Sequence, residues 1–435
     1  MMQKRACVYT VGCRLNQAES GIIEDKLRDA GYVIVPFGNE ADVGIINTCT
    51  VTREADAKCR QAVRSFIRKN PMAYTAVVGC YSQLAFKTLA EIRGVDLIIG
   101  TQEKLNVVNY ITDKKNPIPV VVRDTIQRDD FTIDASGYTQ IQERTNLKIQ
   151  DGCDFMCAFC AIPFARGRAR SRQFRNTLEE ARQLVDSGVR EIILTGVNIG
   201  MYRSENYTLC DVVDALAAIP GLTRIRVSSI EPTTIPEGLL DRMVAYDHPL
   251  VPFLHIPAQS GSNRILELMK RRYSREDFLE FIQLAVNKVP DLCIGTDLMV
   301  GFPGETDEDF WATYTLLKES PIAYAHVFKY SERRNTAASR MVDKVSNAVQ
   351  DKRSALLREL SSEKRSAFHE KFVGRIRTVL FESEVGDGLW CGHTDNYITV
   401  LAKWKDGKAN TFVPVRIQKL SGDHVIGSIE NRNVQ

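Results

Sequence analysis

Short apolar runs alternate with longer helical stretches over residues 5–100. The runs ACVYTVGC, VGIINTC, TAVVGC and VDLIIG have the composition of buried strands. A stretch from Asn16 to Ala30, with Ile22 and Leu27 at helical spacing, separates the first run from the second. Strands that alternate with helices form parallel sheets with right-handed crossovers. The pattern therefore predicts a Rossmann-like domain in residues 1–115.

A second alternation begins at residue 144. The runs LKIQDG, EIILTGV, TRIRVSS, PFLHIP, LCIGTDLMVG and AYAHVFKY are separated by helical segments. Six β/α units are fewer than the eight of a closed TIM barrel, so residues 144–343 are expected to form a partial, open (β/α)6 barrel. Thr177 is expected to cap a helix in this part, with Glu180 completing a capping box. Residues 116–143, which include the run IPVVV, are interpreted as a linker.

The pattern changes again after residue 343. Residues 344–370 form one charged helical stretch, which we expect to connect two domains. In residues 371–435 apolar and polar positions alternate, with turn signals such as Asp387-Gly388 and Asp406-Gly407. Alternation with short turns is typical of antiparallel strands. The last segment thus predicts a small antiparallel β-barrel, and the whole chain is α/β in class.

The composition of the chain argues against several classes of protein. The 57 Lys and Arg residues against 54 Asp and Glu leave a net charge of +3, which argues against a chain that coats nucleic acid indiscriminately. No run of about 18 apolar residues is present in the sequence, so no membrane span is expected. The start of the sequence does not resemble a secretory signal. We therefore expect a cytoplasmic protein whose 11 cysteines are thiols or metal ligands rather than disulfides.

Three cysteines lie close together after the first strand of the second alternation. Cys153, Cys157 and Cys160 form a Cys-x-x-x-Cys-x-x-Cys run. A structural zinc site normally takes four protein ligands, and neither a Cys nor a His supplies a fourth nearby in the sequence. Iron-sulfur cubanes also normally take four cysteines, so the trio indicates either a distant fourth ligand or an iron reserved for a small molecule. Active sites of barrels are built at this end of the strands.

A second trio of cysteines is dispersed along the sequence. Cys13, Cys49 and Cys80 each end one of the first three predicted strands. The carboxyl ends of parallel strands meet at one edge of a sheet, so the fold can bring these thiols together. Taken alone, they could equally be small buried residues beside tight turns. The other cysteines are interpreted as packing residues: Cys7, Cys59, Cys210, Cys293 and Cys391.

The run that holds Cys153, Cys157 and Cys160 resembles that of radical S-adenosylmethionine (SAM) enzymes. In that superfamily three cysteines hold a [4Fe-4S] cluster whose open iron chelates the methionine part of SAM. Reductive cleavage of SAM then gives a 5′-deoxyadenosyl radical. The resemblance implies the same role for these three cysteines, and it implies that Phe159 lies beside the adenine.

Segments around the dispersed trio narrow the resemblance. GCRLNQAES, NTCTV and GCYSQ, with QDGC, RGRARSR, HIPAQSGS and TDLMVGFPGET further on, resemble the methylthiotransferase family. The resemblance implies that Cys13, Cys49 and Cys80 hold an auxiliary [4Fe-4S] cluster and that the last barrel is an RNA-binding, TRAM-like domain. One SAM would supply a methyl group to a cluster sulfur, and a second would generate the radical that abstracts a substrate hydrogen. The six cysteines are thus the expected catalytic and metal-binding residues.

The family acts on several substrates. They are tRNA adenosines next to the anticodon, bearing an isopentenyl or a threonylcarbamoyl group, and an aspartate of a ribosomal protein. GCRLNQAES, NTCTVTREAD and the IEP that follows Ser229 resemble the threonylcarbamoyladenosine branch most closely. The expected partners are the anticodon stem-loop of tRNA and a flavodoxin-like electron donor, with the protein a monomer. An iron-sulfur RNA-binding scaffold without turnover is the alternative from another class.

Polar residues near the ends of the barrel strands are candidates for contacts with SAM. Each could instead cap a helix or satisfy a turn. They are Thr195, Gly196, Asn198, Ser228, Glu231 and Gln259. The arginines at positions 166, 168, 170, 172 and 175 form either a solvated face or a grip on the cosubstrate carboxylate or RNA phosphates, and Arg170 is a candidate cofactor ligand.

Two further sets of residues have candidate roles. His255 and His326 lie inside apolar runs and are interpreted as core or rim residues. Small barrels bind RNA through basic and aromatic side chains, although alternation should bury half of the aromatic ones. The last segment carries both kinds: Lys403, Lys405, Lys408, Arg416 and Lys419, with Trp390, Tyr397, Trp404 and Phe412.

Overall fold

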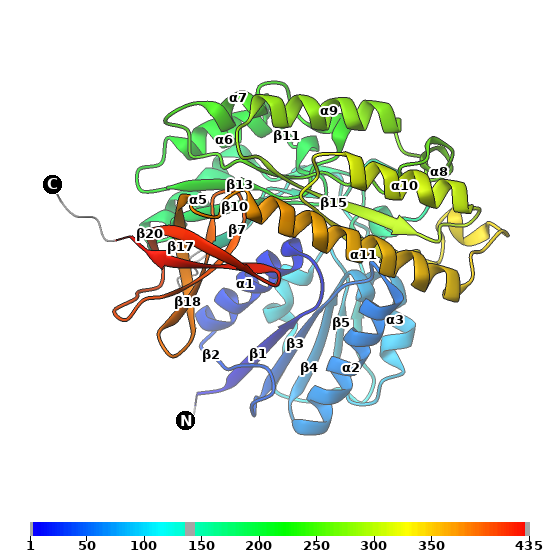
Figure 1. Ribbon diagram of the computed structural model, residues 1–435. Coiled ribbons are helices and arrows are strands. Elements are labelled where there is room, and N and C mark those ends of the chain that lie inside the picture. Colours follow the sequence, from blue (N-terminus) through cyan, green and yellow to red (C-terminus); the bar gives the residue numbers. More distant parts are fainter. Residues whose placement is uncertain (1–2, 135–143, 431–435) are drawn as a thin grey trace.

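The computed structural model describes residues 3–134 and 144–430. Figure 1 shows three parts: a sheet with helices in blue and cyan, a larger α/β part in green and yellow, and a small barrel in red. Residues 135–143 of the predicted linker, with 1–2 and 431–435 at the termini, lie outside the described residues. Across the described ranges, the structure contains no helix with the length and apolar character of a membrane span.

The first part is a parallel sheet with helices on both faces. Its strands are β1 (Arg5–Thr10), β2 (Val33–Ile34), β3 (Val43–Thr48), β4 (Tyr74–Gly79), β5 (Leu97–Ile99) and β6 (Val120–Val122), and its helices are α1 (Arg14–Asp29), α2 (Arg53–Lys69), α3 (Cys80–Ala90) and the 3-10 helix η1 (Lys104–Tyr110). Within the described residues the strand order is β2-β1-β3-β4-β5-β6. Ile45 and Val78 face α1 and η1, whereas Ile46 and Val77 face α2 and α3. Because both faces are covered, β3 and β4 are buried throughout, and the Rossmann-like prediction is confirmed.

Strand β6 lies in the segment that we interpreted as a linker. It pairs with β5 in the register Leu97↔Val120, so the first sheet continues past residue 115. Val120 and Val121 remain exposed because β6 is a short strand at the edge of the sheet. A run of this length gives no periodic signal that separates an edge strand from an extended linker.

The central part is an open barrel of parallel strands. They are β7 (Arg144–Lys148), β10 (Glu191–Thr195), β13 (Arg224–Val227), β14 (Phe253–His255), β15 (Cys293–Val300) and β16 (Tyr324–Lys329). Bridges between Ile225 and Leu250 and between Ser229 and His255 join the β7-β10-β13 and β14-β15-β16 sheets. In the described part of the chain the two edge strands, β7 and β16, do not pair. The prediction of a partial (β/α)6 barrel is thus confirmed.

Short elements and helices cover the strands of this barrel. They are β8 (Gln150–Asp151), α4 (Ile162–Arg166), β9 (Arg170–Ser171), α5 (Phe174–Asp186), α6 (Leu209–Ala217), α7 (Leu239–Val244), α8 (Asn263–Leu268), α9 (Arg275–Lys288) and α10 (Asp307–Glu319). The Thr177 hydroxyl lies inside the first turn of α5 and donates to the Gln173 oxygen at 3.0 Å. Glu180 is paired with Arg172. The predicted capping box is therefore wrong, because α5 begins at Phe174 with Gln173 as its N-cap, which places Thr177 inside the helix.

The last part is a closed barrel that follows the long helix α11 (Asn347–Glu370). Its strands are β17 (Ile376–Gly386), β18 (Leu389–Thr394), β19 (Thr399–Lys403), β20 (Thr411–Ser421) and β21 (His424–Ile429), closed in the order β17-β18-β19-β21-β20. The β19–β21 pair is parallel, so the prediction of a wholly antiparallel barrel is wrong at this pair. Directions cannot alternate around a closed ring with an odd number of strands.

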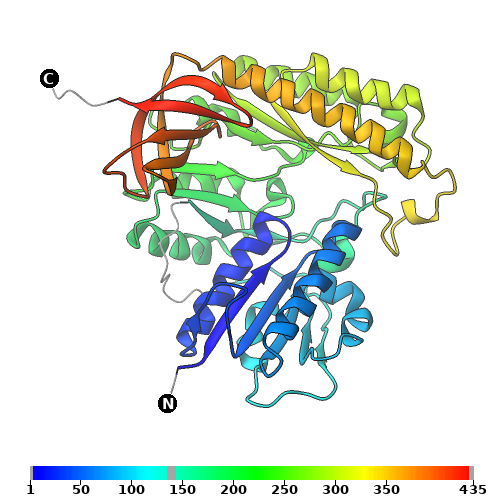
Figure 2. The same ribbon diagram turned by 60° about the horizontal axis from the view of Figure 1, so that its bottom comes forward.

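A buried ion cluster fastens the last barrel to the central sheet. Glu191 pairs with Arg226, whose Nε lies 2.8 Å from Oε1, and with Arg224 at 3.6 Å. Arg226 in turn donates to the Asp395 oxygen at 2.8 Å, and Arg224 donates to the Thr378 oxygen at 2.7 Å. Figure 2 shows the red barrel lying against these green strands. One carboxylate therefore holds both arginines that reach across the domain boundary.

Glu191→Gln should lower stability most at neutral pH. Burial alone would raise the pKa of Glu191, but the ion pairs with Arg226 and Arg224 lower it from 4.5 to about 2. A lowered pKa contributes stability that is complete above the unfolded value and is lost as the pH falls through the folded value. We expect the variant to be less stable by about 3 kcal/mol at pH 7. The difference from wild type should shrink at pH 3, as followed by thermal melts.

The control for this comparison is Glu359→Gln, which removes an exposed carboxylate from α11. It should change the melting temperature little at either pH, because exposed substitutions usually have small effects. An equal loss at pH 7 and pH 3 in Glu191→Gln would show that the ion pairs do not cause the pH dependence.

Candidate active site

The dispersed cysteines meet at the carboxyl edge of the first sheet. Cys13 is the N-cap of α1, Cys49 follows β3, and Cys80 begins α3 after β4. Burial is the main cause that raises the pKa of the Cys49 thiol to about 12, and the Cys80 and Cys13 sulfurs raise it further through their charges. The three thiols are thus near enough to interact electrostatically.

Two residues allow Cys13 and Cys49 to approach each other. Gly12 has φ +114°, and a Cβ at this position would meet the Cys49 sulfur at 2.8 Å. Asn16 is buried in the first turn of α1, where its Nδ2 donates to the Thr48 oxygen at 3.0 Å. This amide ties the helix that begins after Cys13 to the strand end that precedes Cys49.

The other three cysteines, Cys153, Cys157 and Cys160, lie on the loop between β8 and α4. The backbone N–H groups of Phe155 and Ile162 donate to the sulfurs of Cys153 and Cys160, each at 3.4 Å. Burial raises the pKa of Cys153 to about 11 and that of Cys160 to about 12. Hydrogen bonds to sulfur favour the thiolate form. The loop is therefore built to carry negative charge once a metal ionises the thiols.

Both trios fit clusters better than single ions. In the described residues no group of three or more His, Cys, Asp or Glu side chains is arranged to hold one metal ion. The ligands of a cubane bind different irons at separate corners, so they stand farther apart than the ligands of one ion. Each trio supplies three thiols, which fits a [4Fe-4S] cluster with one iron free for another ligand.

Arg271 is a site residue that the sequence patterns do not single out. Its Nη1 donates to the Cys157 sulfur at 3.3 Å, and its Nη2 is paired with Glu231. The side chain is 2% exposed, and its guanidinium lies 5.0 Å from the centre of the Tyr273 ring. In sequence it belongs to KRRYS, which has the pattern of an exposed charge run. The fold brings the segment that contains Arg271 back to the cysteine loop, where the Ala158 N–H donates to the Met269 oxygen at 2.9 Å.

The polar candidates from the strand ends gather around the carboxyl ends of β10, β13 and β14. Asn198 Oδ1 accepts a hydrogen bond from Thr234 at 2.9 Å. Its Nδ2 and the Ser228 hydroxyl, however, are buried without a hydrogen-bond partner in the part of the chain that the structure describes. Buried polar atoms are rarely left unpaired. These two atoms therefore fit a polar ligand such as SAM.

The other cofactor candidates lie nearby. Thr195 and Gly196, at the end of β10, line a cavity between the three parts of the molecule. Gln259 has φ +63° and donates its backbone N–H to the Asp297 oxygen at 2.8 Å. Phe159 is half-buried against a hydrophobic cluster to which α8 and β15 contribute Ile265 and Met299. Their contacts with SAM stay predictions.

A set of buried charges, called the seam network here, joins the first and central parts. Arg166 Nη1 lies 3.0 Å from Glu19 and 2.9 Å from Asp151. Lys148 lies 2.7 Å from each of the same two carboxylates, and Lys104 also pairs with Glu19. Glu19 is completely buried and belongs to α1, the helix that begins after Cys13 of the dispersed trio. The network clamps the cysteine loop of the central part to that helix.

The arginines after the cysteine loop divide into two groups. Arg166 and Arg172 are buried in ion pairs, so the interpretation that these two grip cosubstrate or RNA is wrong. Arg168 and Arg175 are exposed. Arg170 is also buried: it lies 3.7 Å from Asp151 and donates to Gln102 Oε1 at 3.1 Å, and its contact with the cofactor stays a prediction. Burying a charge is costly unless it is paired, which explains why the inner arginines meet carboxylates.

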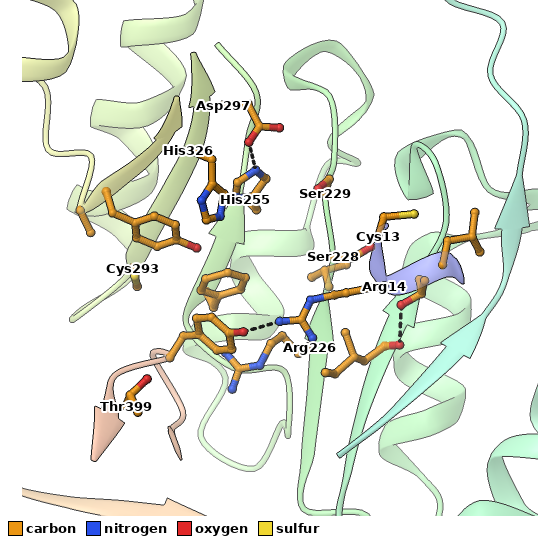
Figure 3. Close-up of a pocket in the computed structure, with 18 of the residues that line it drawn as sticks. Cys13, Arg14, Arg226, Ser228, Ser229, His255, Cys293, Asp297, His326 and Thr399 are labelled. Carbon is orange, nitrogen blue, oxygen red and sulfur yellow. Dashed lines mark hydrogen bonds and ion pairs between the residues drawn. The ribbon is translucent and has the colours of Figure 1, made fainter. Parts of the chain in front are cut away.

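A cavity of about 740 Å³ lies where the three parts meet. Figure 3 shows Cys13 and Arg14 on one side, with Ser228, Ser229, His255, Asp297 and His326 at the strand ends and Thr399 from the last barrel. His255 Nε2 lies 3.0 Å from Asp297 Oδ1. Both histidines are therefore on the cavity wall, in agreement with their interpretation as rim residues.

The aromatic residues of the last barrel all contact protein groups. Trp390 is in the barrel core, and Trp404 packs on it with 5.8 Å between ring centroids. The Arg224 guanidinium lies 4.7 Å from the centre of the Phe412 ring, and Tyr397 lines the cavity. Of these four aromatics Trp390 is buried and the other three are half-buried, so the prediction that alternation buries half of them is wrong. The basic candidates are exposed: Lys403, Lys405, Lys408, Arg416 and Lys419.

Two protein-family models match the chain. Residues 147–317, most of the central part, match the radical SAM superfamily. Residues 5–100, the first sheet through β5, match a family described as uncharacterized protein family UPF0004. The two matches fall on the segments that carry the two cysteine trios.

Curated relatives extend over nearly the whole chain. A protein of Bacillus subtilis named threonylcarbamoyladenosine tRNA methylthiotransferase MtaB is 37% identical and covers 94% of this chain and 93% of its own length. A protein of Thermotoga maritima with the same name is 33% identical over 97% and 96%. The tRNA-2-methylthio-N(6)-dimethylallyladenosine synthase of Chloroherpeton thalassium is 34% identical over 98% and 96%.

A solved structure shares the fold. The radical SAM methyltransferase TsrM from Kitasatospora setae matches with a TM-score of 0.53 over 74% of this chain and 72% of that chain, at 13% identity. This likeness concerns the fold alone. The relatives with 33–37% identity decide the family, because their similarity spans both cysteine trios and the last barrel. The chain belongs to the radical S-adenosylmethionine methylthiotransferase family.

Proposed function

We propose that this enzyme converts N6-threonylcarbamoyladenosine next to the anticodon of tRNA to its 2-methylthio derivative. The relatives from Bacillus subtilis and Thermotoga maritima are named for this activity and support the proposal. The relative from Chloroherpeton thalassium is named for dimethylallyladenosine, which makes that nucleoside the second candidate substrate.

The protein is a radical SAM methylthiotransferase that uses SAM and two [4Fe-4S] clusters. A scaffold without turnover is thereby excluded. When bound, these groups supply a 5′-deoxyadenosyl radical and a methylthio group. We assign Cys153, Cys157 and Cys160 to the cluster that binds SAM, and the dispersed trio to the auxiliary cluster.

The observation that carries the proposal is the shared cavity. Cys13 and Cys49 line one side of it, and Thr195 and Ser228, two candidate SAM ligands, line another. A substrate base in this cavity would lie between the dispersed trio and these candidate SAM ligands. Walls from three parts of the chain surround this cavity and would shield a bound substrate from part of the solvent.

The proposal also concerns partners. The exposed lysines of the last barrel, among them Lys403, Lys405 and Lys408, support contacts with the phosphates of an anticodon stem-loop by a TRAM-like domain. A flavodoxin-like protein is the proposed electron donor, and the enzyme is proposed to act as a monomer.

Cells that lack the gene test the proposal through the nucleosides of their tRNA. Mass spectrometry should show loss of the 2-methylthio derivative of threonylcarbamoyladenosine and accumulation of its precursor. The gene should restore the derivative, and a Cys153→Ala variant should not. Retention of the derivative in the deletion strain would contradict the proposal, and loss of the methylthio derivative of dimethylallyladenosine would favour the second candidate.

A further inference from the structure

Arg14 is the residue that follows Cys13, and it lies in the wall of the cavity (Figure 3). Its Nη2 donates to the Tyr397 hydroxyl, and its guanidinium carbon lies 5.5 Å from the centre of the Tyr397 ring. Tyr397 belongs to the last barrel, 383 positions later in the chain. A residue beside the dispersed trio is thus oriented by a different domain.

The charge of Arg14 has no carboxylate partner among residues 3–134 and 144–430. The other arginines of the cavity wall differ, since Arg226 is paired with Glu191 and Arg365 lies 3.1 Å from Asp423. Arg14 is half-buried, and removing a cation from water is costly unless an anion compensates it. A neutral tyrosine hydroxyl does not provide that compensation.

The field of this cation reaches the opposite wall of the cavity. Burial is the main cause that lowers the pKa of His326, and the charges of His255, Arg365 and Arg14 lower it further. His326 is therefore neutral at pH 7 and can exchange hydrogen bonds with a ligand without adding charge. Asp297, the acidic residue on this wall, is engaged by His255 at 3.0 Å. The cavity therefore places an uncompensated cation on one side, and on the other side a neutral His326 beside an Asp297 that is already engaged by His255.

We propose that Arg14, oriented by Tyr397, binds the carboxylate of the threonylcarbamoyl group and thereby selects this substituent over a dimethylallyl group. The inference rests on the proposed function and deepens it. The threonylcarbamoyl group ends in a carboxylate, which arginine binds through charge-assisted and often bidentate hydrogen bonds. A dimethylallyl group is a hydrocarbon, so it would leave the Arg14 charge uncompensated. Sites that leave a polar group unpaired discriminate strongly against the ligand that lacks its partner.

The test measures binding by the reconstituted holoenzyme of three synthetic anticodon stem-loops. They carry the threonylcarbamoyl group, the same group as a methyl ester, or a dimethylallyl group. Wild type should bind the free acid roughly tenfold to a hundredfold more tightly than the ester, the range expected for a hydrogen bond to a charged group. In Arg14→Gln this ratio should fall to about one, and Arg14→Lys should keep part of it.

Two further variants serve as controls. Tyr397→Phe keeps the ring and removes the hydroxyl that orients Arg14, so it should reduce the ratio by less than Arg14→Gln does. Arg68→Gln removes an exposed cation from the last turn of α2, outside the cavity. It should leave the ratio of acid to ester unchanged. Iron content of each variant shows that both clusters are loaded.

The outcomes separate this inference from the proposed function. An Arg14→Gln variant that keeps the wild-type ratio of acid to ester overturns the inference. If the wild-type holoenzyme methylthiolates the dimethylallyl stem-loop and not the threonylcarbamoyl one, the proposed function is overturned and the inference with it. Turnover by wild type thus tests the substrate, and the ratio of affinities tests the role of Arg14.

Discussion

Replacing Cys49 by alanine should abolish transfer of the methylthio group while SAM is still cleaved. Cys49 belongs to the trio on the first sheet, whereas Cys153, Cys157 and Cys160 lie on a separate loop of the central part. Losing one of three protein ligands should empty the auxiliary cluster site and leave the cluster that binds SAM loaded. The variant should therefore hold roughly half of the wild-type iron. One reaction mixture provides both readouts: 5′-deoxyadenosine and the methylthio nucleoside, each measured by mass spectrometry.

Matched cysteine variants complete this experiment. Cys210→Ala removes a buried thiol from α6, far in sequence from either trio, and should retain both products. Cys157→Ala should lose both products, because the radical is then not formed. Methylthio transfer at the wild-type rate in Cys49→Ala would be incompatible with a role for the dispersed trio as an auxiliary centre.

Glu19→Ala should produce the largest loss of stability. Glu19 is completely buried and pairs with Lys104, Lys148 and Arg166. Burial alone would raise its pKa, but these three cations hold it far below the ordinary value of 4.5. Removing the carboxylate leaves the buried Lys104 without its partner and leaves Lys148 and Arg166 to share Asp151, which costs about 3–5 kcal/mol. Chemical denaturation followed by circular dichroism at pH 7 measures the shift of the unfolding midpoint.

Glu359→Gln again provides the exposed comparison and should change the midpoint little. Because Asp151 still pairs with Lys148 and Arg166, Glu19→Ala should separate the first part from the central one before either unfolds. Limited proteolysis should therefore cut the variant between residues 115 and 144 sooner than wild type. Equal midpoints for Glu19→Ala and wild type would show that the seam network does not hold the two parts together.

Local patterns were enough to predict most of the architecture. Strands such as β3 and β4 are recognisable because burial on both faces demands continuous apolar runs, and the helices between them follow a period that packing imposes. The spacing of Cys153, Cys157 and Cys160 keeps three thiols on one loop in any fold. Predicting the dispersed trio needed a further step of reasoning, because Cys13 and Cys49 come together only where parallel strands end at the same edge of the sheet.

The edge strand of the first sheet, the closure of the last barrel and the start of α5 were less predictable from the sequence. The exposed strand β6 carries too short an apolar run to be told from a linker. The parallel pair β19–β21 follows from the number of strands in the closed ring, which no single strand reveals. The capping box at Thr177 had the right spacing and failed because the helix begins earlier, at Phe174, with Gln173 as its N-cap.

The sequence alone predicted most of the elements, the order of the three parts and the grouping of the six cysteines, because these follow from local spacing, from strand order or from the family resemblance. Only the tertiary structure decided what the charged residues do. Arg166 meets Glu19 across 147 positions, Arg271 reaches Cys157 across 114, and Arg14 contacts Tyr397 across 383. Whether a guanidinium faces water, a buried carboxylate or a substrate cavity depends on how the domains pack against each other. That packing produces no periodic pattern of residues in the sequence around the arginine.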